Sequence, residues 1–400
     1  MRKNMRPIRI GVDIRNLLTG KLSGVGQYTI QTLRHLLRID KVNTYVLFYN
    51  SYRDLDERFE QLVKDYPFLR SSNVEVKKSR WINFPLLIHA LYKPLNWPKA
   101  DFACGGLDVM FMPSPQMLPL SRKCAKVTTF HDLIFLIYPK YFTYSSRLWQ
   151  WQMNYPYEAR TSDIVIAVSE ATKKDILRFT RARADRIRTI PEGVGEEYFA
   201  VPPPELLLAV KAKFNLPDKY LFFVGNIEPR KNLSTVIRAL YELKLSSSDT
   251  IKLVLAGGKS WLADDLYQAI DELGLKDDVI FTGWVTEQEK IAMLHNAEAL
   301  VFPSHYEGFG LMILEAFACR CPVICSNVSS LPEVAGDAAL LVEPQDYKGL
   351  ARHIQSLLEN RELRRTLVAK GYERARYFSW ERSAKRTLDA IYEAVEIHGE

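Results

Sequence analysis

The second half of the chain alternates two kinds of segment, and this alternation constrains the fold more than any other feature. Short runs rich in β-branched and aromatic residues are separated by segments in which apolar residues recur at helical spacing, as in LSTVIRALYELKL at 233–245. A buried strand and an amphipathic helix in repeated succession predict a parallel sheet with helices on both faces. The expected strands lie at 220–226, 251–258, 279–285, 299–304, 322–327 and 339–344.

The first half repeats the pattern less regularly, with strands expected at 8–14, 44–50, 108–114, 126–132 and 163–169. Three consecutive prolines follow Val201, and they cannot continue a strand or a helix interior, so we place the domain boundary there. We therefore predict an α/β protein with two doubly wound, Rossmann-like domains that face each other across a cleft at the carboxyl ends of their strands. The expected parts are an N-terminal domain at 1–200, a Pro-rich linker at 201–217, a C-terminal domain at 218–380, and a C-terminal helix at 381–400 that packs back towards the N-terminal domain.

Composition narrows the class of protein. The 400 residues are 47% hydrophobic and 25% charged, as in globular proteins, and no apolar run reaches the roughly 18–20 residues of a membrane span. The basic N-terminus lacks a signal-peptide pattern, so we expect a cytoplasmic protein. Of the five cysteines, Cys319, Cys321 and Cys325 are clustered without a nearby histidine, which leaves a zinc site one ligand short and predicts buried thiols.

The segment HYEGFGLMILEA, His305–Ala316, carries two carboxylates around a glycine-rich turn. Gly308 and Gly310 allow close approach of the backbone, and the helix expected after them would present free N–H groups to an anion such as phosphate. Glu307 and Glu315 flank that position, and carboxylates accept hydrogen bonds from hydroxyl groups. A ligand with a sugar at each end and phosphates between them, a nucleotide sugar, fits this arrangement.

Three other strand ends carry candidate site residues. Arg230 and Lys231 lie between a strand and a helix, where they could clamp a diphosphate or be solvated surface charges. His131 follows a strand of the first half, and it is either a site residue or a histidine of the core. Gly24 opens an expected helix, but the glycines around it lack the spacing of a dinucleotide-binding turn.

The whole chain resembles the retaining glycosyltransferases of family four, which have the GT-B fold. The resemblance rests on EGFGLMILE at 307–315 with its paired glutamates, GNIEPRKN at 225–232, LAGG, FTGWV and SNVSSLPEVAGDAALLVEP in the second half, and SGVGQYT, FHD and AVSEATKKDI in the first. It implies an acceptor-binding N-terminal domain and a C-terminal domain that binds the nucleotide sugar.

The resemblance also implies roles for single residues. Glu307 would contact the transferred sugar, His131 would lie beside it, and Arg230 with Lys231 would neutralise the diphosphate. The donor would further be held by Gly24, Gly257, Trp284, Val285, Phe309, Gly310, Leu311 and Glu315, with Glu315 on the ribose. Asn226 and Glu192 depart from the common pattern, in which arginine and asparagine stand at these positions. The variant EPRKN resembles mannosyltransferase branches, which favours GDP-mannose over a UDP-sugar.

The implied reaction transfers a hexose to a glycan or lipid-linked acceptor with retention of configuration, and it requires no metal or other cofactor. An inverting glycosidase or a phosphorylase is the alternative enzyme, because two carboxylates about 6.5 to 9.5 Å apart can act as its acid and base. A non-catalytic sugar-nucleotide-binding protein is the alternative from another class. No nucleic-acid partner is expected.

The first half carries a basic excess that suggests an anionic partner. Residues 1–200 contain 31 Lys and Arg against 19 Asp and Glu, whereas residues 201–400 contain 23 against 28. Between Val76 and Ala100 there are five basic residues and no acidic one, interleaved with aromatic residues and leucines. The stretch 74–100 is therefore either a core segment with a basic edge or an interfacial segment on an anionic membrane. Peripheral docking on the inner membrane face is the hypothesis that we carry forward.

Overall fold

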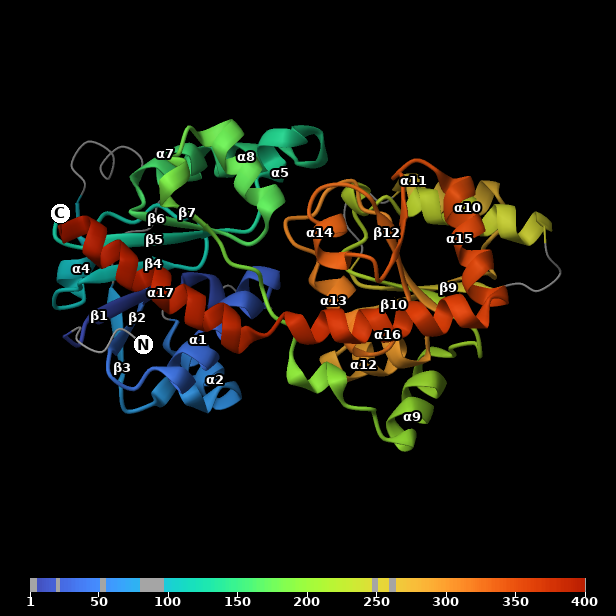
Figure 1. Ribbon diagram of the computed structural model, residues 1–400, viewed down its shortest axis with the longest axis horizontal. Coiled ribbons are helices and arrows are strands. Elements are labelled where there is room, and N and C mark those ends of the chain that lie inside the picture. The colour runs from blue at the N-terminus through green and yellow to red at the C-terminus, as the bar shows by residue number, and fades with distance from the viewer. Residues whose placement is uncertain are drawn as a thin grey trace. The chain divides into compact units, whose positions relative to one another are not determined.

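The computed structural model describes residues 6–18, 22–50, 55–79, 97–246, 251–258 and 264–399 (Figure 1). The chain divides into two compact units. The first unit comprises Met1–Glu192 and Trp380–Glu400, and the second comprises Gly193–Ser379. The predicted linker at 201–217 contains a helix of the second unit, α9 (Pro204–Phe214), whose first residue is a proline. Proline suits that position because the N–H group that it lacks would have no partner in the helix.

The first unit is built on a seven-stranded parallel sheet in the order β3-β2-β1-β4-β5-β6-β7. The middle strands are fully buried because both faces of the sheet are covered by helices. All five strands predicted in this half are present, and the short edge strands β3 and β7 are additional. The strands are β1 (Arg9–Asp13), β2 (Thr44–Asn50), β3 (Val74–Ser79), β4 (Val109–Met112), β5 (Ala125–Phe130), β6 (Ile164–Ala167) and β7 (Ile187–Thr189).

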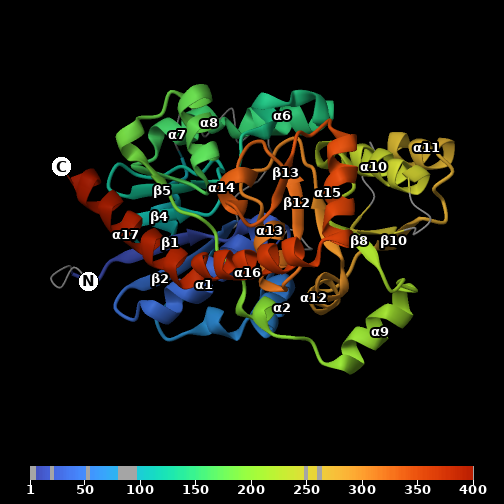
Figure 2. The same cartoon turned by 45° about the vertical axis from the view of Figure 1, so that its right-hand side comes forward.

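The C-terminal helix α17 (Trp380–Gly399) completes the first unit. It packs beside α1 and over β4, β5 and β6, so the predicted return of the last helix to this domain is confirmed (Figures 1 and 2). Asn43 donates a hydrogen bond to the Tyr392 hydroxyl (2.6 Å), which ties the helix to the start of β2. The other helices are α1 (Gly24–Ile39), α2 (Asp56–Asp65), α4 (Ala100–Ala103), α5 (Ile134–Ile137), α6 (Tyr144–Met153), α7 (Tyr155–Thr161) and α8 (Glu170–Thr180).

The second unit contains a six-stranded parallel sheet in the order β10-β9-β8-β11-β12-β13. The chain builds β8, β9 and β10 outward in one direction and then returns to place β11 on the other side of β8, so the strand order reverses between β8 and β11. All six predicted strands are present. They are β8 (Tyr220–Val224), β9 (Lys252–Ala256), β10 (Val279–Gly283), β11 (Ala299–Phe302), β12 (Val323–Ser326) and β13 (Leu340–Val342).

The helices of the second unit cover both faces of this sheet. Thr286 and Glu289 form a reciprocal capping box at the start of α12. The helices after α9 are α10 (Leu233–Ser246), α11 (Asp264–Glu272), α12 (Glu287–Asn296), α13 (Leu311–Ala318), α14 (Leu331–Ala335), α15 (Tyr347–Glu359) and α16 (Arg361–Tyr377). Among the described residues, no helix has the length and apolar character that crossing a bilayer requires. The five cysteines are buried and unpaired, as predicted.

Candidate active site

A group of charged residues, two of them buried, lies in the second unit at the point where the strand order reverses. β8 and β11 are neighbours in the sheet, and the segments that leave their carboxyl ends carry Arg230, Lys231 and Glu307. Ligands of doubly wound sheets bind at this position, because the connections diverge there and leave a crevice. The fold therefore brings together three of the residues that the sequence singled out.

The loop after β8 is fastened to the loop after β11 by main-chain and side-chain bonds. The His305 N–H donates to the Arg230 carbonyl (2.9 Å), and the Asn232 side-chain amide donates to the Pro303 carbonyl (2.9 Å). Asn232 adopts a left-handed conformation (φ 57°), which asparagine tolerates better than most residues. The two loops are thus held as one structure, and the charged side chains have fixed positions.

Glu307 forms ion pairs with both cations of the loop. Lys231 Nζ donates to Glu307 Oε1 (2.7 Å), and Arg230 Nη1 donates to Oε2 (2.8 Å). Burial alone would raise the pKa of Glu307, but Arg230 and Lys231 outweigh burial and lower the pKa to about 2. The pKa of Lys231 is lowered by burial, which Glu307 offsets only in part. Glu307 is therefore an anion at every physiological pH.

Arg230 has a second carboxylate partner, Glu228. Its Nε and Nη2 atoms donate to Glu228 Oε1 (3.1 and 2.6 Å), while Nη1 also donates to the Tyr306 carbonyl (3.1 Å). The Glu228 carboxylate is 30% exposed, against 11% for that of Glu307. Because Glu228 is the more exposed of the two, it is the partner that an incoming anion can replace at lower cost.

The turn after Glu307 leads into α13, and its backbone geometry requires glycine at one position. Gly310 caps the helix with φ 111°, where a side chain would be strained, and a Cβ atom there would lie 2.9 Å from Leu331 Cδ2. The buried hydroxyl of Ser330 is close to the carbonyls of Glu307 (2.9 Å) and Phe309 (2.7 Å). Phe309 is buried, and Leu311 begins the helix. The turn is thus fixed, and the N-terminus of α13 lies just beyond the charged cluster.

Glu315 lies on α13, where it is buried and paired with Lys290 of α12. Lys290 Nζ lies 2.8 Å from Glu315 Oε2 and 3.1 Å from Glu287 Oε1, and 5.1 Å from the centre of the Tyr198 ring. Burial raises the pKa of Glu315 to about 7, and the charge of Lys290 offsets only part of this effect. The pKa of Lys290 is raised because the two glutamates outweigh its burial. The lysine thus supports the anionic form of Glu315, the form that accepts hydrogen bonds best.

Glycines at the ends of β8, β9 and β10 bring three backbones close together. A Cβ atom on Gly257 would lie 1.9 Å from the Gly225 carbonyl oxygen, and the Gly257 N–H donates to the Gly283 carbonyl (2.8 Å). Trp284 follows directly, is 61% exposed, and has its indole nitrogen 2.8 Å from the position of a Cβ atom on Gly258. Val285 is half-buried. The predicted donor-binding loops at Gly257 and at Trp284–Val285 are therefore neighbours at one edge of the sheet.

His131 and Gly24 belong to the first unit. His131 follows β5, and its ring lies edge-on to that of Tyr28, one turn along α1 from Gly24 (ring centroids 4.7 Å apart). Its Nδ1 is 3.1 Å from Glu192 Oε1, and its Nε2 is 2.9 Å from the Pro113 carbonyl oxygen. Both partners are acceptors, so the ring satisfies both hydrogen bonds only when both nitrogens carry protons. Gly24 is exposed, and a Cβ atom there would meet no other atom within 4 Å.

The pKa of His131 should depend on Glu192. Burial favours the neutral ring, but the hydrogen bond and charge of Glu192 outweigh burial and raise the pKa above its ordinary value. Because the folded value is the higher one, this pair stabilises the fold below the ordinary pKa and the contribution is lost as pH rises through the folded value. We expect an NMR titration to place the pKa of His131 above the ordinary histidine value, and Glu192→Gln to lower it. A wild-type His131 that titrates at or below the ordinary value would contradict this assignment.

Sequence reasoning missed Lys290, Glu228 and Ser330. Lys290 stands in the segment EQEKIAMLHN, which looks like a solvated helix, and only its position in space brings it to Glu315. Ser330 lies in SNVSSLPEVAGDAALLVEP, which was assigned to the family pattern without a role for any single residue. Among the described residues, no group of three or more histidine, cysteine, aspartate or glutamate side chains could hold a metal ion.

Two parallel, doubly wound sheets are the architecture of the GT-B glycosyltransferases. Residues 208–374 match the family model of glycosyl transferases group 1, and residues 22–198 match that of glycosyltransferase family 4. The chain is 30% identical over 375 residues to the O-antigen chain mannosyltransferase B of Escherichia coli, which covers 92% of this chain and 96% of that protein. The protein therefore belongs to the family 4 (group 1) glycosyltransferases.

Solved structures agree with the fold. Anabaena HepE in complex with UDP and glucose has a TM-score of 0.71 at 16% identity, with 96% of this chain and 99% of that chain covered. Sucrose-phosphate synthase from Thermosynechococcus elongatus has a TM-score of 0.71 at 22% identity, with 96% and 98% covered. The predicted fold class and family are thus confirmed.

Proposed function

We propose that the protein is a retaining mannosyltransferase that moves mannose from GDP-mannose to a glycan or lipid-linked acceptor, with a UDP-sugar as the second candidate donor. The cluster of Arg230, Lys231 and Glu307, which lies where the strand order of the second sheet reverses, carries this proposal. It combines two cations suited to a diphosphate with one carboxylate suited to sugar hydroxyls. Mannose is favoured because the relative named above, similar over 96% of its length, is a mannosyltransferase.

The geometry supports a reaction driven by stabilisation of the leaving group. Arg230 and Lys231 are fixed before the donor binds, so they meet the developing charge of the diphosphate without reorganisation. The diphosphate would replace Glu228 on Arg230, while Glu307 would remain and accept hydrogen bonds from the mannose hydroxyls. Retention follows if the acceptor attacks from the face that the diphosphate leaves, with a diphosphate oxygen accepting the proton of the acceptor hydroxyl.

Within this proposal, the remaining residues hold the donor. Glu315, supported by Lys290, would bind the ribose, and the loops at Gly257 and Trp284–Val285 would hold the base. The N–H groups of Phe309, Gly310 and Leu311 would meet the sugar and the distal phosphate, Gly24 would approach the phosphates, and His131 would lie beside the mannose. His131 would act there as a fixed cation, because both of its ring nitrogens are engaged with Glu192 and Pro113.

A nucleotide panel tests the proposal with the least assumption. We expect GDP to raise the melting temperature of the protein more than UDP, ADP or inorganic phosphate at equal concentration. The effect should persist in EDTA, because two protein cations replace the metal as counter-ions of the diphosphate. Stabilisation only by UDP would make a UDP-sugar the better candidate donor. Loss of the stabilisation in EDTA, with recovery on addition of manganese or magnesium, would overturn the metal-free mechanism. A glycosidase would respond to sugars and to no nucleotide.

Membrane docking is a further part of the proposal. Most of the stretch that carried this hypothesis, 80–96, lies outside the described residues. Its first part is the edge strand β3, in which Lys78 forms an ion pair with Asp56 and Glu75 with Arg9. Lys77 is the basic residue of β3 for which no ion pair is present among the described residues. We propose that this edge docks on anionic lipid, where each basic residue contributes ~1 kcal/mol.

Liposome cosedimentation tests this docking. Binding of the wild type should rise with the fraction of anionic lipid and fall in Lys77→Glu with Arg80→Glu, a pair that leaves the ion pair of Lys78 intact. Lys123→Glu, an exposed charge reversal elsewhere in the first unit, serves as the matched control. If the wild type ignores anionic liposomes at low salt, the acceptor is not presented on such a surface and a free glycan becomes the better candidate.

A further inference from the structure

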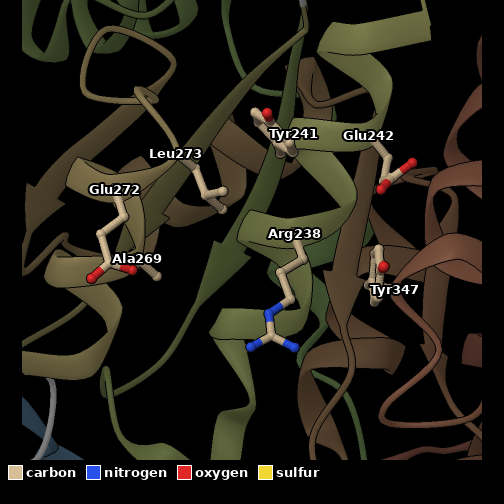
Figure 3. A pocket seen from close by; sticks show the side chains of 7 residues that line it. All are labelled: Arg238, Tyr241, Glu242, Ala269, Glu272, Leu273 and Tyr347. Carbon is tan, nitrogen blue, oxygen red and sulfur yellow. The ribbon is translucent and has the colours of Figure 1, made fainter.

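A groove on the second unit lies between three helices and shares no residue with the charged cluster. Figure 3 shows Arg238, Tyr241 and Glu242 on α10, with residues of α11 on one side and Tyr347 of α15 on the other. The spacing of three and four residues places the α10 side chains on one face of that helix. The volume of the groove is about 340 Å³, at the lower end of the range for small-ligand sites. The lining is completed by Ala269 and Glu272 of α11 and by Leu273, the residue that follows this helix.

The polar groups of this groove are available to a ligand. Within the described part of the chain, Arg238 and Glu242 form no ion pair, and both side chains line the groove. Glu272 accepts a hydrogen bond from Gln268 through Oε1 (2.8 Å), and its second carboxylate oxygen can accept a bond from a ligand. Tyr241 and Tyr347 line the groove and are half-buried, so part of each side chain is accessible. One guanidinium with five donors and two carboxylates thus line the groove together with the apolar side chains of Ala269 and Leu273.

This combination selects a chemical class. A phosphate or a nucleotide would meet the carboxylates of Glu242 and Glu272, and a cationic ligand would meet the guanidinium of Arg238. A neutral saccharide avoids both conflicts. Each sugar hydroxyl both donates and accepts, so one ligand can satisfy the guanidinium and the carboxylates together, while the C–H faces of the sugar rings pack on tyrosine.

We propose that the groove between α10, α11 and α15 is a second sugar-binding site, which holds a neutral segment of the acceptor glycan apart from the site of transfer. The choice of a mannose glycan as ligand rests on the proposed function, whereas the class of neutral saccharide rests on the groove alone. A chain held at a second point stays near the enzyme between transfers, because the held segment raises its effective concentration. The site would therefore favour extension of long acceptors over short ones.

Binding to the full-length protein without nucleotide tests the site directly. We expect linear mannotriose to perturb NMR signals of groove residues, and Tyr347→Ala or Arg238→Met to weaken its binding at least about tenfold, the scale of losing a stacked ring or a hydrogen bond to a charged group. Tyr377→Ala is the matched control, since Tyr377 is 60% exposed on the same unit but outside the groove. Unchanged affinity in the groove variants would overturn the proposal, as would binding of inorganic phosphate or GDP at the groove in place of the saccharide.

A second measurement separates this site from the proposed function. With a short acceptor, Tyr347→Ala should transfer at the wild-type rate, and with a long acceptor it should release shorter products. If the protein transfers no mannose, the direct binding assay is repeated with glucose and galactose oligosaccharides. Binding of one of these at the groove would retain the second site and reject the mannosyltransferase, and binding of none would reject the second site as well.

Discussion

Replacement of Arg230 and Lys231 together by alanine should lower the rate of sugar transfer by at least about a hundredfold, the usual scale for losing preorganised charge stabilisation. Both side chains are held on Glu307 before any donor binds, at 2.8 and 2.7 Å. Their removal takes both cations of the cluster away from the developing charge of the diphosphate. Initial rates at saturating donor measure the effect, because the cations act on the chemical step as well as on binding.

Stability has to be separated from catalysis in this experiment. Loss of Lys231 leaves Glu307 buried with fewer partners, and breaking a buried ion pair costs about 3 to 5 kcal/mol. The matched control is therefore Lys244→Ala with Arg364→Ala, which removes two cations from ion pairs with Asp278 and Glu298 in the same unit. The control should transfer normally. Near-normal turnover in the Arg230 and Lys231 variant would place the diphosphate elsewhere, and equal losses in both variants would point to destabilisation of the unit.

The strands of both sheets could be predicted from sequence because their signals are local. A buried strand such as YLFFV at β8 or ALVF at β11 is apolar on both faces, as expected for a parallel sheet covered by helices. β3 and β7 carried no such signal. VEVKKS of β3 is half-exposed at an edge, and the three residues of β7 are too few for a period to appear.

The site was predictable where its residues follow strands and not where it depends on partners distant in sequence. Arg230, Lys231 and Glu307 were identified separately from two loops, and their direct pairing follows from the adjacency of β8 and β11. Lys290 is 25 positions before Glu315 on another helix, so no pattern in the sequence joins them. Glu192 was noticed as unusual, but its contact with His131 depends on the fold of the first unit.

Glu307→Gln should separate binding of the nucleotide from transfer of the sugar. The change removes a negative charge close to both cations, so affinity for the nucleoside diphosphate should be kept or increased. Transfer should fall at least about tenfold, since the amide cannot replace a charged acceptor for the sugar hydroxyls. Glu315→Ala should instead lower the affinity for the nucleoside diphosphate, because a ribose contact contributes to nucleotide affinity. Calorimetry with GDP and initial rates on the same preparations measure the two quantities.

The stability of the Glu307 variant gives an independent test of the same cluster. The pKa of Glu307 in the folded protein, about 2, lies below its ordinary value of 4.5. The ion pairs of Glu307 with Arg230 and Lys231 therefore stabilise the wild type above pH 4.5 by about 3 kcal/mol, and this contribution is lost as the pH falls towards 2. Glu307→Gln should lack this acid-dependent loss of stability, and it should unfold at a lower temperature than the wild type at neutral pH. GDP should stabilise this variant more than it stabilises the wild type, because the diphosphate supplies the missing negative charge. Glu228→Gln is the matched control, since it removes the same charge from the more exposed partner of Arg230 and should keep transfer. Parallel loss of GDP affinity and transfer in Glu307→Gln would mean that Glu307 organises the diphosphate site and does not hold the sugar.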